Sequence, residues 1–469
     1  MSTISQPPHA ASRSADDATT PVLIRGARPY GDAPTDLLLR AGRIAALGEQ
    51  AAATATHLAE DGTPALTVEA AGQIALPGLV DLHTHLREPG REDAETVETG
   101  SRAAALGGFT AVHAMANSTP AADSAGVVEQ VHRLGREAGW TRVQPVGAVT
   151  VGLAGERLAE LGAMAESSAA VRMFSDDGQC VHDPVLMRRA LEYVKAVDGF
   201  VAQHAQEPRL TAGAQMHEGA VSAELGMPGW PAVAEESIIA RDVLLAEHVG
   251  SRLHVCHVST RGSVEIIRWA KSRGVDVTAE VTPHHLLLTD EQVRSFDPVY
   301  KVNPPLRTAE DVEALRAALA DGTIDVVGTD HAPHPEQAKE CEWVDAAMGM
   351  TGLETALPVL IATMIETGLM DWRRLAEVTS ERPAQIHRHA HLGRPIAVGE
   401  TADLVLVDPA ERRTVRPGEH ATKGRNSPYA GRELPGRVRA TFLAGHPVVL
   451  DGAPATSRTG RTADRTVAP

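Results

Sequence analysis

The feature that most constrains the fold is an alternation repeated over residues 77–387, in which a short β-branched or apolar run is followed by polar residues and a longer stretch with helical spacing. Short apolar runs bounded by turns are typical of buried strands, and longer amphipathic stretches are typical of helices that cover a sheet. The predicted strands are 78–84, 109–115, 142–149, 170–174, 199–204, 252–257, 275–281 and 324–329. Eight strands that alternate with helices predict an α/β fold, a (β/α)8 TIM barrel.

Both flanks of this region carry short alternating runs such as PVLIRGARP and ADLVLVDP, broken by glycine and proline. These runs are typical of antiparallel strands. Neither flank is long enough for a full sandwich, so we expect a small composite β-sandwich domain from residues 21–76 and 389–450, around a barrel at 77–388. Residues 1–20 and 451–469 are predicted to be a disordered extension and a flexible tail, because small and polar residues dominate them.

Charge and composition exclude several classes of function. The 44 basic and 61 acidic residues give a formal net charge of -17, the wrong sign for a protein that binds nucleic acid through its phosphates. No apolar run reaches the length of about 18 residues that a membrane span needs. The three cysteines are too few and too scattered for a disulfide framework or a thiolate zinc site. We therefore expect a cytoplasmic protein with neither nucleic acid nor a membrane as partner.

The strongest local signal is the segment GLVDLHTHLREPG, which ends the first predicted barrel strand in His83-Thr84-His85. Side chains alternate along a strand, so the two imidazoles face the same way, with Asp81 behind them. Neutral imidazoles on a rigid strand end suit a zinc ion. An isolated pair of this kind is equally compatible with two structural histidines.

Further candidate ligands fall at the C-terminal ends of other predicted strands, where barrel enzymes place their active sites. They are Asp176 or Asp177 after the fourth strand, His204 after the fifth, His257 after the sixth and Asp330 after the eighth. If one carboxylate joins two metal ions about 3.5–4 Å apart, a water between them loses its proton near neutral pH, which is hydrolase chemistry. No lysine ends the fourth strand, so an aspartate is expected to join the ions in place of a carboxylated lysine.

The motifs DLHTHLREPG, AMANSTP, FSDDG, HVST, VTPHHLLLTD, KVNPPLR, GTDHAPH and GLETALP occur in this order. In their order and combination the chain resembles the class I bacterial dihydroorotases of the cyclic amidohydrolase superfamily, from about residue 22 to 450. The resemblance implies a zinc-dependent hydrolase with two Zn²⁺ per chain. It also implies the reaction, a reversible interconversion of (S)-dihydroorotate and N-carbamoyl-L-aspartate in pyrimidine biosynthesis.

The resemblance assigns the metal ligands residue by residue. The implied ligands are His83, His85, Asp177, His204, His257 and Asp330. The two histidines of the first strand would bind one ion, the two later histidines the other, and Asp177 would bridge them. The resemblance also implies Asp177 in preference to Asp176, because the spacing from Asp177 to His204 matches that of the family. Asp330 would complete the first site and carry a proton to the leaving nitrogen.

The resemblance also implies how the substrate is held. The implied substrate-binding residues are His85, Arg87, Asn117, Asn303, His334, Met348 and Gly349. Arg87, Asn117 and His334 would share the substrate carboxylate, while Asn303 and the backbone near Met348 would hold the ring. An arginine can offer a bidentate fork to a carboxylate, and its place two residues beyond His85 favours that role over a solvated one.

Several residues near these motifs are expected to be structural. Cys256 should point away from the face that carries the neighbouring histidine. The run His387, His389 and His391 is predicted to be a solvated connection after the last helix, because no carboxylate or cysteine accompanies it. The segment AQHAQEP departs from the pattern of many relatives, which affects the residues flanking the strand-five ligand, such as Gln206.

Two other classes of function compete with this interpretation. Hydantoinases, dihydropyrimidinases and allantoinases share the fold, but they typically use a carboxylated lysine and lack the arginine of HLREPG, so Asp177 and Arg87 favour a dihydroorotase. A silent scaffold for aspartate carbamoyltransferase would be expected to have lost metal ligands, whereas all six positions are filled here. The family also implies a homodimer. No motif decides whether the chain associates with aspartate carbamoyltransferase.

Overall fold

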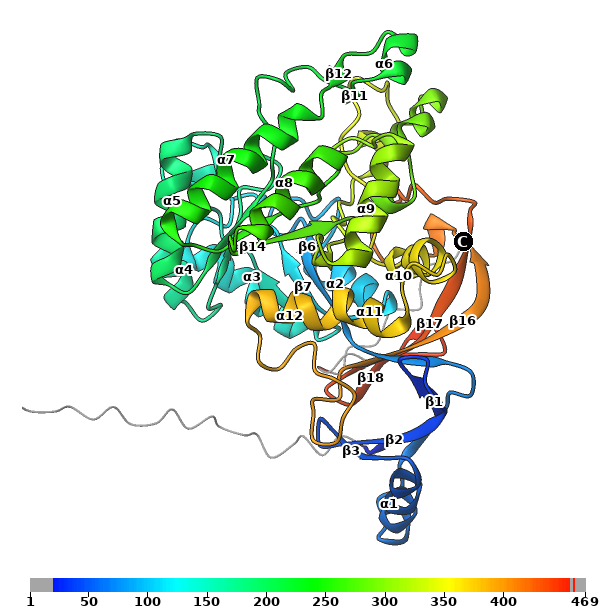
Figure 1. The fold of residues 1–469 in the computed structure, drawn as a ribbon. Helices are drawn as coiled ribbons and strands as arrows, with labels where there is room; N and C mark the ends of the chain where they lie inside the picture. The colour runs from blue at the N-terminus through cyan, green and yellow to red at the C-terminus, as the bar shows by residue number, and fades with distance from the viewer. Residues whose placement is uncertain (1–19, 456–458, 460–469) are drawn as a thin grey trace, which may run out of the picture.

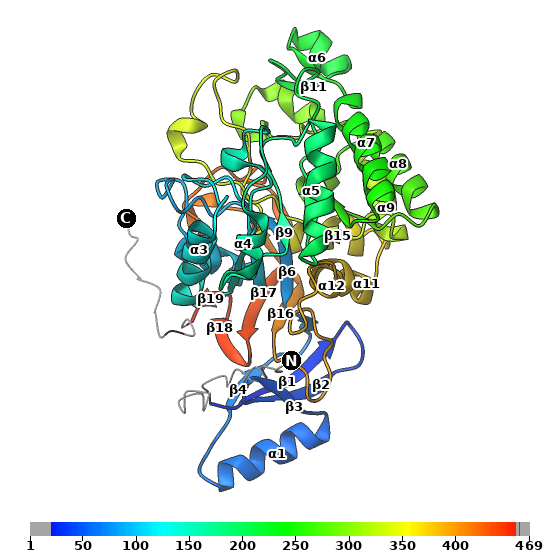
Figure 2. The same ribbon diagram turned by 90° about the vertical axis from the view of Figure 1, so that its left-hand side faces the viewer.

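The structure is a computed structural model that describes residues 20–455 and residue 459. Nearly all of the predicted extension and most of the predicted tail, namely 1–19, 456–458 and 460–469, lie outside the described residues. Strands surrounded by helices form one part of the molecule, and a sheet from both ends of the chain forms the other (Figures 1 and 2).

Each of the predicted inner strands is present, and each pairs in parallel with a neighbour. They are β6 (Leu79–Thr84), β7 (Phe109–Ala114), β8 (Arg142–Pro145), β9 (Met173–Phe174), β10 (Phe200–Gln203), β13 (Leu253–Val255), β14 (Val277–Val281) and β15 (Val326–Val327). One sheet has the order β6-β7-β8 and a second has the order β15-β14-β13-β10-β9. Parallel bridges between Gly147 and Phe174 and between Thr84 and His331 join the two sheets at both edges, so the strands follow one another in a ring.

Helices lie outside this ring (Figure 2). They are α2 (Val97–Leu106), α3 (Ala125–Ala138), α4 (Leu161–Glu166), α5 (Pro184–Ala196), α7 (Val233–Val249), α8 (Arg261–Ser272), α9 (Ala309–Asp321), α10 (Ala356–Leu360), α11 (Trp372–Ala376) and α12 (Arg382–His387). Local sequence fixes their starts. Before α5, for example, the Asp183 carboxylate accepts a hydrogen bond of 2.8 Å from Leu186 N, and Pro184 takes the first helical position, where no amide proton is needed.

Short elements shape the loops. They are β11 (Met216–His217), β12 (Gly229–Trp230), α6 (Ala220–Leu225), the 3-10 turns η1 (Val151–Leu153), η2 (His284–Leu286), η3 (Asp290–Ser295), η4 (Pro298–Tyr300), η5 (Glu336–Ala338) and η8 (Pro417–Glu419), and the π-helical turns η6 (Ile361–Ile365) and η7 (Glu377–Glu381). Of these, β11 and β12 pair in parallel and lie with α6 at the edge of the molecule furthest from the terminal sheet (Figure 1). The loops after the ring strands therefore carry most of the added structure.

The two ends of the chain build one mixed sheet. Its strands are β1 (Val22–Pro29), β2 (Thr35–Arg40), β3 (Arg43–Leu47), β4 (Leu66–Glu69), β5 (Ile74–Pro77), β16 (Leu404–Thr414), β17 (Glu433–Leu443), β18 (His446–Leu450) and β19 (Ala453–Pro454). The order β19-β18-β17-β16-β5-β1-β2-β3, with β4 on β1, gives a 9-stranded sheet. The antiparallel pair β5 and β16 joins the N-terminal and C-terminal strands, so strands from both flanks belong to one sheet.

The alanine-rich helix α1 (Glu49–Glu60) packs on the terminal sheet and was not predicted from the sequence. Its buried residues Ala51, Ala55 and Leu58 contact Leu38 and Ala46. Small side chains with high helix propensity allow this close approach.

An apolar layer fills the interior of the ring. Its members are Leu82, Met115, Val146, Met173, Phe200, Ala202, Cys256, Val326 and Ile386. Such a layer makes the ring a packed core, so polar chemistry is confined to its ends. Among the described residues, no helix has both the length and the apolar character needed to cross a membrane.

Candidate functional site

Asp177 lies among four buried histidines at the C-terminal ends of the ring strands. Its Oδ1 is 3.3 Å from each of three ring nitrogens, namely His83 Nε2, His204 Nδ1 and His257 Nε2. Its Oδ2 is 3.3 Å from His85 Nε2. The structure thus brings together five of the residues that the sequence resemblance implied as ligands.

Asp330 joins the cluster from the segment that follows β15. Its Oδ1 lies 3.0 Å from His85 Nε2 and 3.6 Å from His83 Nε2. Two groups of potential ligands result, in each of which the donor atoms lie within 4.8 Å of one another. They are His83, His85 and Asp330, and Asp177, His204 and His257. The grouping matches the division into two metal sites that the resemblance implied.

The charges in the cluster keep both carboxyl groups ionised. Burial alone raises the pKa of Asp177, but attraction to His83 and hydrogen bonds from His204 and His257 outweigh it and hold the pKa well below its ordinary value. Burial is likewise outweighed at Asp330, where the hydrogen bond from His85 leads the effects that lower its pKa to about 2. The site therefore presents two carboxylates at neutral pH.

The neighbouring Asp176 has a different environment. Its Oδ1 accepts hydrogen bonds of 2.8 and 2.9 Å from the backbone nitrogens of Val149 and Thr150, and its Oδ2 accepts one from the Thr150 hydroxyl. It holds the segment after β8 against the one after β9. Of the two adjacent aspartates, Asp177 is the one that contacts the histidines.

Glu280 on β14 is a buried carboxylate that the sequence analysis missed. Its Oε1 lies 2.5 Å from His83 Nδ1 and accepts a 3.2 Å bond from His257 N, while its Oε2 lies 3.2 Å from His254 Nε2. Attraction to His83 and hydrogen bonds from both histidine rings outweigh burial and hold its pKa far below the ordinary value. A glutamate within the largely apolar strand VTAEV could have indicated this role from the sequence, because a buried carboxylate rarely lacks a partner. Glu280 fixes the orientation of the His83 ring.

Arg87 and His334 lie at the edge of the cluster. Arg87 has a left-handed backbone (φ 60°) and donates from Nε to Pro333 O over 3.2 Å. Within the described part of the chain its guanidinium forms no ion pair with a carboxylate, although both cluster aspartates attract it. His334 Nε2 donates to Met348 O over 2.9 Å, and its buried Nδ1 has no partner. The geometry leaves the Arg87 guanidinium free to meet an anionic ligand, whereas His334 Nδ1 carries a lone pair that can accept a hydrogen bond.

The segment around Gly349 allows the backbone to approach closely. A Cβ at Gly349 would lie 2.8 Å from His334 Nε2, and φ is 144°, so other residues are disfavoured there. Gly349 N donates to Lys301 O over 3.0 Å. Asn426, which the sequence analysis did not single out, donates to Gly349 O over 3.1 Å and accepts from His334 N over 3.0 Å. Asn426 therefore fastens two predicted substrate-binding positions to each other.

One predicted asparagine, Asn117, contacts a ligand histidine directly, and the other, Asn303, is linked to one through Gln206. His85 Nδ1 lies 2.8 Å from Asn117 Oδ1, so the ring donates to the amide oxygen and turns Nε2 towards the aspartates. Gln206 Oε1 accepts from Asn303 Nδ2 over 3.0 Å and lies 2.7 Å from His204 Nε2. The residue that departs from the pattern of relatives thus links a metal-ligand candidate to a substrate-binding candidate.

The expected direction of Cys256 is wrong. Cys256 forms a third group of potential ligands with His83 and Asp177, with donor atoms within 4.8 Å. The period-two rule fails because β13 ends at Val255 and His257 adopts a positive φ of 33°. Burial raises the pKa of the Cys256 thiol, so it stays protonated beside the cluster.

The expected solvated histidine run is also wrong in part. His387 is buried, and its ring stacks on His389 with centroids 3.9 Å apart and planes at 6°. His113 from β7 packs against both rings. Only His391 of the run is exposed.

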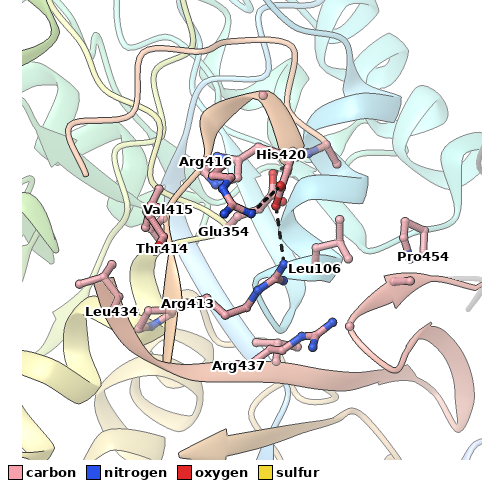
Figure 3. Close-up of a pocket in the computed structure, with 18 of the residues that line it drawn as sticks. Leu106, Glu354, Arg413, Thr414, Val415, Arg416, His420, Leu434, Arg437 and Pro454 are labelled. Carbon is pink, nitrogen blue, oxygen red and sulfur yellow. Dashed lines mark hydrogen bonds and ion pairs between the residues drawn. The ribbon is translucent and has the colours of Figure 1, made fainter. Parts of the chain in front are cut away.

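A cavity of about 1090 Å³ lies away from the histidine cluster, between α2, the segment before α10, and strands β16 and β17 (Figure 3). Its lining is rich in arginine and includes the buried Glu354. Arg413 and Arg416 form ion pairs with Glu419 at 3.6 and 3.1 Å. None of the predicted metal-ligand or substrate-binding residues lines this cavity, so the large cavity and the cluster around Asp177 are separate features.

Comparisons with known proteins agree with the geometry. Residues 72–263 match a family model described as Dihydro-orotase-like. The dihydroorotase of Streptomyces coelicolor is 66% identical over 430 residues, which cover 92% of this chain and 98% of that protein. The dihydroorotase of Mycobacterium tuberculosis is 55% identical over 432 residues, with 92% and 99% covered. Among solved structures, the L-hydantoinase (dihydropyrimidinase) of Arthrobacter aurescens superposes with a TM-score of 0.80 at 25% identity, covering 93% of this chain and 97% of that one.

Proposed function

The chain belongs to the dihydroorotase family and is a hydrolase of a cyclic amide, and we propose that it interconverts (S)-dihydroorotate and N-carbamoyl-L-aspartate at the cluster around Asp177. The observation that carries this proposal is the convergence of four histidines and two ionised carboxylates beside the unpaired Arg87 guanidinium. Hydantoinases resemble the fold, but an aspartate at the centre in place of a carboxylated lysine favours a dihydroorotase, and the arginine beside it favours an anionic substrate.

We propose that two Zn²⁺ ions are the cofactors. The residues fit such ions, because His83 Nε2 is buried without a hydrogen bond of good geometry and the donor set of imidazoles and carboxylates suits zinc. His83, His85 and Asp330 would hold one ion, His204 and His257 the other, and Asp177 both. When bound, the ions would polarise the scissile carbonyl and make water a nucleophile at neutral pH.

Asp330 is the proposed proton carrier. Its low pKa makes it a carboxylate before the reaction, so it can accept a proton. In the hydrolytic direction it would then deliver that proton to the departing ring nitrogen, and in the biosynthetic direction it would take the proton back. Its Oδ1 lies 3.0 Å from His85 Nε2, which places the carboxylate at the cluster where both steps would occur.

The substrate carboxylate is proposed to bind Arg87, with Asn117 and His334 beside it. Arg87 provides charge and a planar fork. His334 would donate to the carboxylate from Nδ1, which requires the ring proton to move there from Nε2 and the bond to Met348 O to be given up. Asn303 and the backbone at Met348 and Gly349 would hold the ring amides. With its bond from His334 given up, Met348 O would be free to accept from a ring N–H of the substrate, whereas Gly349 N would exchange its bond to Lys301 O for one to the substrate.

The arrangement of the strands also supports a proposal for the domain boundaries. We take the ring of strands as the (β/α)8 barrel at 77–388. We take the terminal strands as the β-sandwich domain from 21–76 and 389–450, in which β1 would belong to both layers, because it pairs with β2 and β4 along most of its length and with β5 at its end. The extension would be 1–20 and the tail 451–469. We also propose a cytoplasmic homodimer. Size-exclusion chromatography with light scattering tests the dimer, and co-purification with aspartate carbamoyltransferase tests that association.

The experiment that tests the function is the ultraviolet loss of dihydroorotate by the purified protein, with metal content measured on the same sample. Hydantoin, dihydrouracil and allantoin are assayed beside it. Turnover of dihydroorotate alone, with about two zinc ions at the cluster, is the expected result. Turnover of an uncharged cyclic amide in place of dihydroorotate would contradict the substrate assignment and leave the hydrolase class standing.

A further inference from the structure

A second histidine cluster lies at the other end of the ring. It consists of His113 on β7, His387 at the end of α12, and His389, whose donor atoms lie within 4.8 Å of one another. The rings of His113 and His387 have centroids 4.5 Å apart, and those of His387 and His389 are 3.9 Å apart. Arg388 between the last two adopts a left-handed backbone (φ 62°), which turns the chain back and places His389 over His387.

Apolar neighbours place this lower histidine cluster near the starts of the strands. Val80 near the start of β6 and Ala111 near the start of β7 pack with Ala384 of α12 and with Leu392. His113 follows Ala111 by two residues, so both side chains face the same way along β7. The cluster around Asp177 occupies the opposite, C-terminal ends of the strands, so the two clusters share no residue.

Within residues 20–455 and residue 459, no hydrogen-bond partner is found for four buried nitrogen atoms of the lower cluster. They are His113 Nε2, His387 Nδ1, His387 Nε2 and His389 Nε2. Each such buried group destabilises the fold when no partner satisfies it. His113 Nδ1 donates to Asp81 O over 2.8 Å, which assigns the ring proton to Nδ1 and leaves a lone pair on Nε2.

The surroundings keep these rings neutral. Burial lowers the pKa of His113 to about 3 and that of His389 to about 4. Two arginines lie nearby and are themselves engaged, since Arg142 pairs with Asp403 at 2.6 Å and Arg252 donates to the backbone carbonyl of Ile386 at 2.8 Å. Neutral imidazoles without a carboxylate favour late transition metals such as zinc, nickel or copper over magnesium or calcium.

We propose that His113, His387 and His389 bind one divalent transition-metal ion, for example Zn²⁺. This site would be separate from the proposed metal site around Asp177. Such an ion would satisfy three of the unpartnered nitrogens at once and fasten the segment after α12 to strand β7. Because two parallel rings cannot both direct a lone pair at one ion, binding requires His387 or His389 to rotate out of the stack.

The test compares the zinc content of matched variants of the full chain. His387→Phe and His389→Phe keep an aromatic ring for packing but remove the nitrogens, and His391→Phe changes the exposed histidine of the same run. Each protein is stripped with a chelator, dialysed against Zn²⁺, and analysed for metal and for dihydroorotate turnover. We expect about one zinc ion fewer per chain in the first two variants, an unchanged count in His391→Phe, and turnover within about two-fold of the parent in all three.

Two outcomes overturn the site. If His387→Phe and His389→Phe bind as much zinc as the parent chain, the lower cluster is a packing feature. If either variant fails to fold, anomalous diffraction at the zinc edge from crystals of the zinc-loaded parent chain decides the matter. A peak among the three rings supports the site, and a water or empty density there overturns it. Failure of the proposed function is distinguishable, because it would show as absent dihydroorotate turnover in the parent chain.

Discussion

The two histidine clusters of this molecule use the same side chain in opposite electrostatic settings. The cluster at the strand ends contains Asp177 and Asp330, and contact with Asp177 raises the pKa of His204 above its ordinary value although burial alone would lower it. The lower cluster has no carboxylate, and burial lowers the pKa of His113 to about 3. Carboxylates rather than histidines therefore decide the charge of each site.

The presence or absence of carboxylates determines which of the two clusters can catalyse a reaction and which can only bind a metal ion. A cluster with ionised carboxylates can hold metal, accept protons and release them. A cluster of neutral rings with unpartnered nitrogens can hold a metal but has no group that moves a proton at neutral pH. The comparison predicts that changes at the strand ends alter turnover and that changes in the lower cluster alter metal content and stability.

The largest effect is expected for Asp330→Ala. Loss of the carboxylate removes the proposed proton carrier, which is worth about 10²–10⁴-fold in kcat, while the fold and most of the metal should remain. Steady-state hydrolysis of dihydroorotate and metal analysis on the same sample measure both quantities. A kcat near that of the parent chain would remove Asp330 from its role.

A matched control for this prediction is Asp176→Asn. Asp176 is a buried carboxylate next to Asp177, but its contacts are to Thr150 and to backbone nitrogen atoms. An amide oxygen can still accept the backbone hydrogen bonds, so thermal stability should fall while kcat stays within about three-fold of the parent. A loss of turnover equal to that of Asp330→Ala would mean that any carboxylate lost near the cluster has the same effect.

The next largest effect is expected for Arg87→Met. Removal of a buried charged partner costs about 2–5 kcal/mol of binding, so kcat/KM for dihydroorotate should fall by about 30-fold or more. Hydrolysis of an uncharged cyclic imide should fall far less, because that substrate has no carboxylate. Parallel assays of the two substrates check the difference, and equal losses on both would argue against the carboxylate contact.

The site at the strand ends could largely be predicted from the sequence, because short motifs at successive strand ends mark it. The ring places those ends together whatever the loops do, so His83 and Asp330 meet although they are far apart in the chain. The choice between Asp176 and Asp177 depended on the resemblance. The structure shows why this choice matters, because Asp176 accepts hydrogen bonds from the backbone whereas Asp177 contacts the histidines.

The lower cluster and Glu280 could not be predicted in this way. His113 lies inside a strand and His387 ends a helix, so no local spacing relates them. Glu280 is a single acidic residue in an apolar strand, and its partners come from two other strands. The period-two rule also misplaced Cys256, because the strand ends before it. Each miss concerns contacts that tertiary packing alone creates.

A smaller effect is expected for Glu280→Gln. The variant keeps the shape but removes the charge that orients His83 and fixes its proton on Nδ1. Partners of ligand histidines typically account for about 10–100-fold in metal affinity, so the variant should lose zinc at lower chelator concentration than the parent. A chelator titration monitored by turnover measures the chelator concentration at which half the activity is lost. An unchanged midpoint would mean that Glu280 does not contribute to metal affinity.

The smallest effect concerns the pH dependence of stability in the metal-free protein. Burial, with His113, His389 and Arg252 nearby, holds the pKa of His387 well below its ordinary value of 6.5. The unfolded chain therefore binds more protons at this residue than the folded chain does below about pH 6.5, and stability falls as the pH is lowered through that range. In His387→Phe the residue no longer titrates, so the fall in Tm between about pH 7.5 and 5 should be shallower. His391→Phe should keep the parent slope because that residue is exposed.

The titrating groups at the strand ends are the same in the parent chain, His387→Phe and His391→Phe, so their contributions to the slope cancel in the comparison. Equal slopes in the parent and His387→Phe would mean that the lower cluster is not held neutral, and the contrast between the two clusters would fail.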